Sequence, residues 1–295
     1  MSARIAFIGL GNMGGPMAAN LVKAGFAVAG FDLSESSREQ ARAAGVTIAE
    51  TAEDAAAGAE IIVTMLPAGR HVLAVWGSLV TVAKPETLMI DCSTIDVESA
   101  RKAHALAADH RLHSIDAPVS GGTGGASACT LTFMVGGTSE AFTKAEPVLQ
   151  AMGKKIVHCG NPGSGQAAKI CNNMILGISM TAVAEAFVLA EKLGLSHQAL
   201  FDVASTSSGQ CWSLASYCPV PGPVPASPAN NDYRQGFAAA LMLKDLKLSQ
   251  EAAEASGAAT PLGAHAAALY EAFDKDGNGS QDLSAIIKHI RHLKD

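Results

Sequence analysis

The sequence predicts an α/β protein whose first half forms a doubly wound parallel sheet and whose second half is entirely helical. Short apolar runs alternate with alanine-rich helical stretches in the first half, a pattern typical of right-handed crossovers between parallel strands. After Gly165 one apolar-periodic stretch continues to Leu193 without a proline, which is longer than an ordinary globular helix. The 295 residues suffice for two domains of about 150 residues each. We expect these domains at residues 1–163 and 164–295, joined by the long helix.

The individual elements follow from the apolar periodicity. Strands are expected at Arg4–Ile8, Ala27–Phe31, Ile61–Met65, Leu88–Asp91, His113–Asp116, Leu131–Val135 and Ile156–His158. Helical stretches between them include Pro16–Ala24, Ser36–Ala43 and Val97–Ala108. The second domain has helical patterns at Gln198–Ser205, Gly236–Ala255, Pro261–Phe273 and Leu283–Leu293. Between them, the loop Ser216–Arg234 holds five of the chain's twelve prolines, and a loop of this length is usually functional or a lid.

Composition and charge exclude several classes of protein. Hydrophobic residues make up 48% and charged residues 16%, so the chain can bury a core and is not disordered. The net charge is −6 without a basic run, so we expect neither a nucleic-acid nor a membrane partner. Six cysteines lack CxxC or metal-site spacing, which predicts reduced thiols and no metal. The run Ile5–Leu10 lacks a signal-peptide cleavage site, and Met174–Ala184 is too short to cross a bilayer, so we expect a cytoplasmic protein.

The strongest local signal is a G-x-G-x-x-G motif between the first strand and the first helix, formed by Gly9, Gly11, Asn12, Met13 and Gly14. Gly9 would make the tight turn, Gly11 would let a pyrophosphate approach the backbone, and Gly14 would let helix and strand pack closely. The pyrophosphate would lie on the free N–H groups of the helix N-terminus. A glycine turn without a ligand is the alternative, and the strand, the helix and the acid described next argue against it.

That acid is Asp32, which ends the second strand 18 residues after Gly14. Its carboxylate would accept hydrogen bonds from the ribose hydroxyls and repel a 2′-phosphate, so the cofactor is expected to be NAD in a Rossmann-type domain. Arg38 lies near enough in sequence to bind such a phosphate, although we interpret it as a solvated arginine. Two further loops should line the same crevice at the strand ends; they contain Leu66 and Pro67, and Ser93 and Thr94.

Two later segments carry candidate substrate and catalytic groups. Ser120, Gly121 and Gly122 follow a strand and offer a hydroxyl and backbone N–H groups to a carboxylate, although a plain glycine turn would have the same sequence. Lys169 and Asn173 lie four residues apart on one face of the long helix, within an apolar stretch. A lone helix lysine is usually solvated, but small and apolar neighbours make burial plausible here. An ammonium group that loses its water has a lower pKa, which suits acid–base work.

These segments together resemble the β-hydroxyacid dehydrogenase family over nearly the whole chain. The shared motifs are GLGNMGGPMAANL from Gly9, DAPVSGG from Asp116, the glycine-spaced block that contains Lys169 and Asn173, and MLKDL from Met242. The segments SGQCWS, YCPVPG and NNDY, which begin at Ser208, Tyr217 and Asn230, resemble the 3-hydroxyisobutyrate branch of that family.

The resemblance implies a mechanism and roles for individual residues. Lys169 would be the general acid/base, and Ser120, Gly121 and Gly122 would hold the substrate carboxylate while Asn173 orients the reacting oxygen. Thr94 and Lys244 would contact NAD, and Asp245 and Trp212 would lie at the substrate. The expected reaction is oxidation of 3-hydroxyisobutyrate to methylmalonate semialdehyde, a step of valine catabolism. Family members often have glycine where this chain has Cys129, which affects the expected pocket shape but not the chemistry.

Three alternative interpretations stay open at this point. A tartronate- or succinic-semialdehyde reductase would share the Lys169 chemistry, and a non-catalytic dinucleotide sensor would not need that lysine. The Asp274–Asp282 loop resembles a calcium-binding EF-hand but has Ala285 where a glutamate is required, so we interpret it as a turn whose Asp282 or Ser284 caps the last helix. Trp212 and Tyr217 suit either substrate covering or plain packing. The long apolar helix predicts a homodimer or homotetramer.

Overall fold

The structure is a computed structural model that describes residues 3–293, and the chain divides into two units between Lys169 and Ile170. The expected boundary between residues 163 and 164 lies six residues earlier. The outermost residues of the two expected domains, 1–2 and 294–295, lie outside the described part of the chain.

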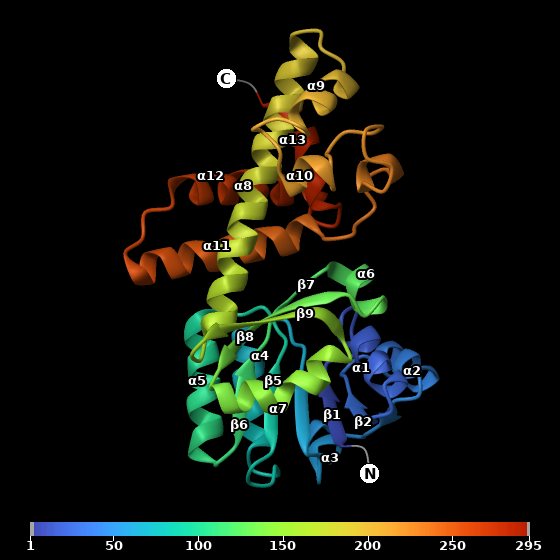
Figure 1. Cartoon of the computed structure of the whole chain (residues 1–295), viewed down its shortest axis with the longest axis vertical. Coiled ribbons are helices and arrows are strands. Elements are labelled where there is room, and N and C mark those ends of the chain that lie inside the picture. Colours follow the sequence, from blue (N-terminus) through green and yellow to red (C-terminus); the bar gives the residue numbers. More distant parts are fainter. Residues whose placement is uncertain (1–2, 294–295) are drawn as a thin grey trace. The chain divides into compact units, whose positions relative to one another are not determined.

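A nine-stranded sheet forms the centre of the first unit (Figure 1). Its strands are β1 (Arg4–Ile8), β2 (Ala27–Phe31), β3 (Thr47–Ile48), β4 (Ile61–Thr64), β5 (Leu88–Asp91), β6 (His113–Asp116), β7 (Val119–Ser120), β8 (Leu131–Gly137) and β9 (Gly153–Gly160). The order is β3-β2-β1-β4-β5-β6-β8-β7, with β9 on β8. The six strands from β3 to β6 are parallel. Their order reverses direction between β1 and β4, which is where nucleotide-binding sheets of this kind hold their ligand.

The expectation of an entirely parallel sheet is wrong at one edge, because β8 runs antiparallel to β6 and β7. Only 14 residues separate Asp116 from Leu131, and they already contain β7 and the short helix α6 (Gly122–Ser127). A parallel return needs a crossover of a dozen or more residues. Residues 121–130, which join β7 to β8, are too few for one, so β8 turns back antiparallel to β7. The next connection contains α7 (Ser139–Gln150) and is long enough to bring β9 parallel to β8.

Helices cover both faces of the sheet, as expected for a doubly wound fold. Alternate residues of each strand point to opposite faces, so Ile5 and Phe7 of β1 join one apolar core and Ala6 and Ile8 the other. The first core includes residues from α1 (Gly14–Lys23), α2 (Glu35–Ala43) and α7. The second includes residues from α3 (Ala52–Ala56), α4 (Gly69–Leu79) and α5 (Val97–Asp109).

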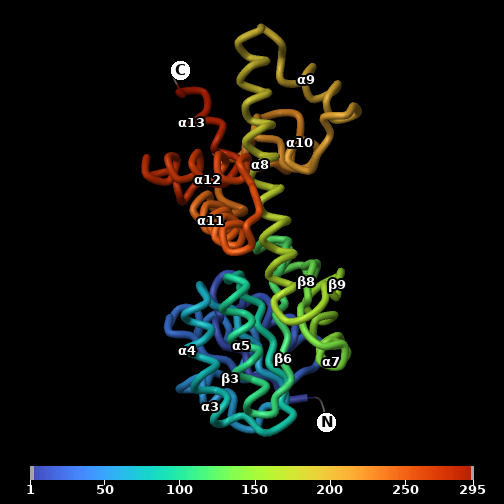
Figure 2. The backbone as a smooth tube through the Cα atoms, turned by 90° about the vertical axis from the view of Figure 1, so that its left-hand side faces the viewer, coloured from blue at the N-terminus to red at the C-terminus, as the bar shows by residue number. Residues whose placement is uncertain are grey.

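The second unit contains helices, turns and loops but no β-strand among its described residues, and it has its own apolar core. It contains most of α8 (Ser164–Lys192), then α9 (His197–Ala204), α10 (Trp212–Ala215), α11 (Ala239–Ser256), α12 (Pro261–Phe273) and α13 (Ile286–His292), together with the short turns η1 (Pro228–Asn231), η2 (Asp274–Asn278) and η3 (Leu283–Ala285). Helices α11 and α12 pack side by side, as both backbone views show (Figures 1 and 2). Helix α11 begins three residues later than expected, because the N–H groups of Gly236 and Phe237 donate to Asp282 Oδ2 instead.

The apolar part of helix α8 is longer than the run Met174–Ala184 that was judged from the sequence. Its 29 residues contain a window with a mean hydropathy of 1.7, so length and composition alone would let it cross a membrane. This corrects the expectation that the apolar stretch is too short. Of that window 44% is buried, and Met180, Ala184 and Phe187 lie fully buried in the core of the second unit. Core helices of globular proteins have the same composition, so packing accounts for the apolar character of α8.

The start of α8 packs directly on the backbone of the sheet. A Cβ atom on Gly165 would lie 2.3 Å from the Met134 carbonyl oxygen and 2.7 Å from that of Asp116. A Cβ on Gly136 of β8 would lie 2.7 Å from the Gly165 nitrogen. Since neither position has room for a side chain, glycine at both is what allows helix and sheet to touch.

We therefore predict opposite effects for two glycine-to-alanine substitutions in helices. Gly165→Ala should lower the free energy of unfolding by about 1–3 kcal/mol, because the added methyl group clashes with rigid backbone. Gly77→Ala should raise it by about 0.5–1 kcal/mol, because Gly77 lies within α4 and its Cβ would meet no atom of residues 3–293 within 4 Å. Thermal and urea unfolding measure both, and a neutral Gly165→Ala would contradict the close packing.

Candidate active site

The glycine motif joins β1 to α1 by a turn that admits no side chain at two of its positions. Gly9 has φ +94°, and a Cβ there would lie 2.3 Å from the Met65 carbonyl oxygen. A Cβ on Gly14 would lie 1.9 Å from the Gly9 carbonyl oxygen. At Gly11 a Cβ would meet no described atom within 4 Å. The outer glycines therefore serve the tight turn and the helix–strand contact, while the backbone at Gly11 stays open to a ligand.

Asp32 connects the end of β2 to this turn. Its Oδ2 accepts a hydrogen bond of 2.7 Å from the Leu10 N–H, and its Oδ1 accepts one of 2.7 Å from the Ser34 N–H. The structure thus brings the glycine motif and the expected ribose-binding carboxylate together at one edge of the sheet. Arg38 forms an ion pair with Glu35 within α2, in agreement with a surface role.

The loops after β4 and β5 are tied together by a buried hydrogen-bond network. Ser93 Oγ accepts from the Leu66 N–H (2.7 Å) and donates to Asp91 Oδ1 (2.6 Å). The Thr64 hydroxyl also donates to Asp91 Oδ1, at 2.8 Å. Leu66 and Ser93 are the neighbours of Pro67 and Thr94, so this network joins the two loops that contain the predicted cofactor residues.

Asp91 is the member of this network whose burial costs free energy. The side chain is 3% exposed, and its Oδ2 is buried without a hydrogen-bond partner among residues 3–293. Burial raises the pKa of Asp91 to about 6, and the nearby Asp116 charge adds to the rise, although hydrogen bonds from Ser93 and Thr64 oppose it. The charged form of this carboxyl is therefore held in the fold at an energetic cost.

The predicted carboxylate-binding segment lies at the end of β7. Ser120 pairs with Thr132 of β8, and Gly121 and Gly122 follow with φ +135° and +61°, a conformation that favours glycine. Cys129, the departure from the family pattern, also has a positive φ of 57°, which explains why glycine is common there. Its thiol donates to the Ala151 carbonyl oxygen at 3.0 Å.

Lys169 and Asn173 lie one helical turn apart on α8, and both are buried. Lys169 is 7% exposed and Asn173 is 1% exposed, which agrees with the burial that the sequence made plausible for Lys169 and not with the solvated alternative. Asn173 Nδ2 donates to Asp245 Oδ2 of α11, and Asp245 is itself 5% exposed. Lys244 precedes Asp245 on α11, so Asn173, Lys244 and Asp245 form one group of predicted site residues within the second unit.

Trp212 and Tyr217 form a separate aromatic pair in the second unit. Their rings stack with centroids 4.7 Å apart, and Trp212 is 52% exposed. The Tyr217 hydroxyl donates to Asp282 Oδ2 at 2.7 Å; burial and this carboxylate raise the pKa of Tyr217. Asp282 also accepts from the Ser284 N–H and so caps η3, the short turn that leads into the last helix. The last helix, α13, itself begins after Ala285 without a side-chain cap, which corrects the prediction that Asp282 or Ser284 caps it. The connection of Asp282 to Tyr217 was not foreseen.

The EF-hand-like loop begins with a short turn in the structure. Residues Asp274–Asn278 form the η2 turn, and a Cβ on Gly279 would lie 1.9 Å from Asp274 Oδ1. Within residues 3–293 no group of three or more histidine, cysteine, aspartate or glutamate side chains is placed to hold a metal ion.

The comparisons with known proteins agree with this geometry. Residues 4–160 match the family model described as the NAD binding domain of 6-phosphogluconate dehydrogenase. Residues 163–290 match the one described as NAD-binding of NADP-dependent 3-hydroxyisobutyrate dehydrogenase. Fold and site together define an NAD-dependent oxidoreductase with an N-terminal dinucleotide-binding domain.

Individual relatives narrow this class to a family. The chain is 53% identical over 291 residues to a probable 3-hydroxyisobutyrate dehydrogenase of Mycobacterium tuberculosis, covering 99% of both chains. The solved structure of a 3-hydroxyisobutyrate dehydrogenase of that organism with L-serine has a TM-score of 0.96, with coverage of 99% and 100%. An NAD-dependent L-serine dehydrogenase of Pseudomonas aeruginosa is 48% identical over 289 residues, covering 97% of both chains. The chain belongs to the 3-hydroxyisobutyrate dehydrogenase family.

Asp91 generates a prediction about stability and pH. Its folded pKa of about 6 lies above the ordinary value of 3.8, so between about pH 4 and pH 6 the native state binds more protons than the unfolded state. Stability should therefore fall as the pH rises through this window and level off above it, by about 2–3 kcal/mol from this group. Asp91→Asn removes the buried charge and should flatten this fall.

Urea unfolding at pH 4.5, 6 and 8 measures the effect. Asp109→Asn, which changes an exposed carboxylate on α5, is the matched control and should leave the pH dependence of wild type in place. Equal slopes for wild type and Asp91→Asn would show that Asp91 is not the group responsible.

Proposed function

We propose that Lys169 is the general acid/base of an NAD-dependent oxidation of a small 3-hydroxy acid. The observation that carries the proposal is a lysine only 7% exposed on α8, one turn from the buried amide of Asn173. In the direction of oxidation, neutral Lys169 Nζ takes the proton of the substrate 3-hydroxyl. NAD, when bound, supplies the acceptor for the hydride that leaves the same carbon. Positioning of these groups then provides most of the rate enhancement.

The remaining predicted site residues hold the substrate and the cofactor. Ser120 and the N–H groups of Gly121 and Gly122 bind the substrate carboxylate, and Asn173 orients the reacting oxygen. Thr94 and Lys244 contact NAD together with the glycine motif, Asp32, Leu66 and Pro67. Asp245 supports Asn173 through the hydrogen bond described above. Trp212 covers the substrate, with Tyr217 as its stacking partner.

We assign 3-hydroxyisobutyrate as the substrate and methylmalonate semialdehyde as the product, which places the protein in valine catabolism. The support is the 53% identity to a probable 3-hydroxyisobutyrate dehydrogenase. L-serine is the second candidate, because an L-serine dehydrogenase is 48% identical over nearly the whole chain. Both substrates have a carboxylate and a primary hydroxyl on the third carbon, so the same residues would serve either.

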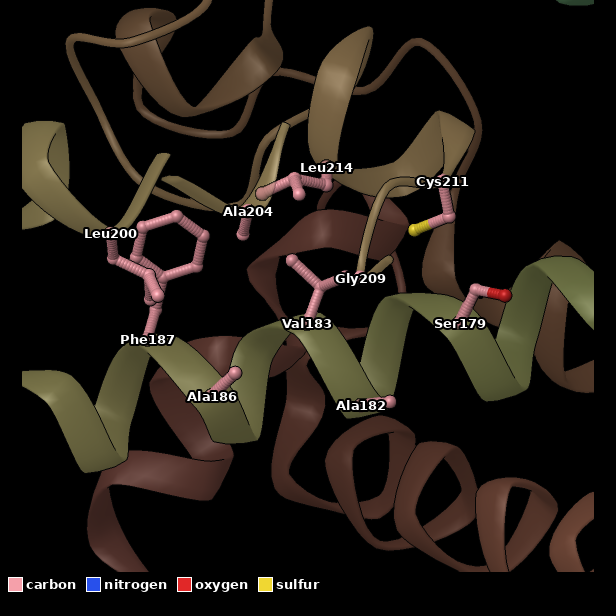
Figure 3. Close-up of a pocket in the computed structure, with 10 residues that line it drawn as sticks. All are labelled: Ser179, Ala182, Val183, Ala186, Phe187, Leu200, Ala204, Gly209, Cys211 and Leu214. Carbon is pink, nitrogen blue, oxygen red and sulfur yellow. The ribbon is translucent and has the colours of Figure 1, made fainter. Parts of the chain in front are cut away.

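The proposal extends to assembly and location. Leu189 (60%) of α8, Leu193 (76%) just after it and Val203 (64%) of α9 are exposed apolar side chains. An apolar cavity of about 270 Å³ opens beside α8, α9 and α10 and is lined by residues such as Val183, Phe187 and Leu200 (Figure 3). Exposed apolar surface of this kind is typical of subunit contacts and supports a homodimer or homotetramer.

All six cysteines are free thiols, in keeping with a cytoplasmic protein.

A substrate panel tests the assignment. Initial rates of NADH formation at 340 nm with 3-hydroxyisobutyrate, L-serine, glycerate and 4-hydroxybutyrate should give the highest kcat/KM for 3-hydroxyisobutyrate. NAD should be preferred over NADP by at least about tenfold, because Asp32 repels a 2′-phosphate. Higher kcat/KM for L-serine would assign the second candidate function, and preference for glycerate or 4-hydroxybutyrate would exclude both.

Lys169→Met tests the catalytic role while keeping the volume of the side chain. We expect kcat to fall by about 10²–10⁴-fold, with the Kd for NADH, measured by fluorescence, changed by less than about threefold. Lys155→Met, which changes an exposed lysine on β9, is the control and should retain the wild-type rate. Near-normal turnover in Lys169→Met would overturn the assignment.

A further inference from the structure

The first turn of α8 is held by a buried carboxylate that the mechanism does not use. Asp116 ends β6 and is 2% exposed. Its Oδ1 accepts the Gly163 N–H at 2.8 Å, and its Oδ2 accepts the Gln166 N–H at 2.9 Å. These are two of the N–H groups that a helix N-terminus leaves without an intrahelical partner, and a carboxylate there also interacts favourably with the helix dipole.

The Asp116 carboxylate is itself fixed by His104 of α5. His104 Nε2 lies 2.9 Å from Asp116 Oδ1, and its Nδ1 lies 2.8 Å from Ser114 Oγ. Because a carboxylate only accepts, the ring donates from Nε2 to Asp116, while its Nδ1 shares a hydrogen bond with the Ser114 hydroxyl. Each ring nitrogen therefore has a partner, and the ring fixes the orientation of the Asp116 carboxylate.

Gln166 connects the same turn to the loop that follows β5. Its side chain is 0% exposed. Its Nε2 donates to the Ser93 carbonyl oxygen at 2.7 Å, and its Oε1 accepts from the Ile95 N–H at 3.1 Å. Thr94, the predicted cofactor contact, lies between these two residues, so Gln166 spans the backbone on both sides of it.

We propose that Asp116 and Gln166 are the positioning residues that fix Lys169 relative to the cofactor loop around Thr94. Lys169 follows Gln166 by three residues, which is less than one helical turn. Five hydrogen bonds of the two side chains, together with the contact of Gly165 with the Met134 and Asp116 backbone, leave this turn no freedom to slide or rotate. The inference rests on the proposed role of Lys169.

Two substitutions break the arrangement at different points. In Asp116→Asn an amide NH₂ replaces one carboxylate oxygen, so either the Gly163 N–H or the Gln166 N–H faces a donor instead of an acceptor. Gln166→Met keeps the length of the side chain and removes both bonds to the Thr94 loop. Thr138→Val is the matched control, because Thr138 Oγ1 caps α7 in the same unit by accepting from the Ala141 N–H, and α7 does not carry Lys169.

Both test variants should lower kcat by about 10–100-fold, because small displacements of a catalytic group cost that much. The KM for the substrate should change less than kcat. The midpoint of the pH–kcat profile should move to higher pH, because a loosened turn admits water to the lysine ammonium group. Hydrogen–deuterium exchange of a peptide containing residues 163–169 should be faster than in wild type, without substrate or cofactor present.

Thr138→Val should lower the melting temperature while leaving kcat, the pH profile and that peptide's exchange unchanged. If the control loses as much kcat as the test variants at an equal loss of melting temperature, the bonds are merely structural and the inference is overturned. Lys169→Met, assayed in the same series, separates the two claims. Normal turnover in Lys169→Met refutes the proposed function, whereas an inactive Lys169→Met beside fully active Asp116→Asn and Gln166→Met refutes only the positioning role. Should Asp116→Asn fail to fold, Gln166→Met decides by the same readouts.

Discussion

The contact between the first turn of α8 and the backbone of the sheet is the constraint on which the rest of the site depends. Gly165 lies so close to the carbonyl oxygens of Met134 and Asp116 that a methyl group on its Cα would clash with both. The helix therefore starts at a fixed point on β6 and β8. Lys169 follows Gly165 by four residues, about one helical turn, so its place within the first unit is set by this contact.

The same contact gives the glycine-spaced segment before Lys169 a physical explanation. Gly160 has φ +127° and Gly163 has φ +85°, so the chain turns sharply twice before the helix begins. Gly165 then supplies the close approach. Each of the three glycines meets a different backbone or steric requirement. The spacing of the glycines is therefore more informative than their number.

The sequence was sufficient to predict the features that depend on local patterns. The strands Arg4–Ile8, Ala27–Phe31 and Leu88–Asp91 have their predicted bounds, because an apolar run between turn residues defines a buried parallel strand. The antiparallel return of β8 was not predicted, because it depends on what a 14-residue connection can physically span. Two-residue strands such as β3 are too short to produce any periodicity.

The candidate site was predictable to a similar extent. The glycine motif, Asp32 and the pair Lys169 and Asn173 have spacings that indicate their chemistry directly. Asp116 and Gln166 do not, because their partners, apart from His104, lie 47 to 73 residues away in sequence. The signals available for Asp116 were its position at the end of a strand and its place at the start of the DAPVSGG motif. Asp282 was predicted as a local cap, but its bond to Tyr217, 65 residues away, could not be inferred without the fold.

Two adjacent buried carboxylates differ in how well hydrogen bonds compensate their charges. Asp91 and Asp116 are directly paired across β5 and β6, so their charges repel. Asp116 is compensated by two helix N–H groups and His104, whereas Asp91 Oδ1 receives two hydroxyl groups and the Ser93 N–H, and its Oδ2 has no partner among the described residues. The carboxylate that holds the first turn of α8 is thus the better compensated one, and the energetic cost of burial falls on its neighbour, which joins the loops after β4 and β5.

The proposed roles of these residues also bear on which of the two candidate substrates the protein prefers. 3-Hydroxyisobutyrate and L-serine share the carboxylate and the hydroxyl that Ser120 and Lys169 would bind, and they differ only in a methyl or an ammonium group on the second carbon. A methyl-sized difference in an apolar pocket is worth about 1–3 kcal/mol, whereas a polar group left without a partner costs more. In the proposed mechanism, Asp116 and Gln166 position Lys169, which would meet only the shared hydroxyl, so these residues would affect the rate with both substrates alike. Discrimination would then come from residues near the second carbon, for which we propose the apolar surface of Trp212 and the buried carboxylate of Asp245.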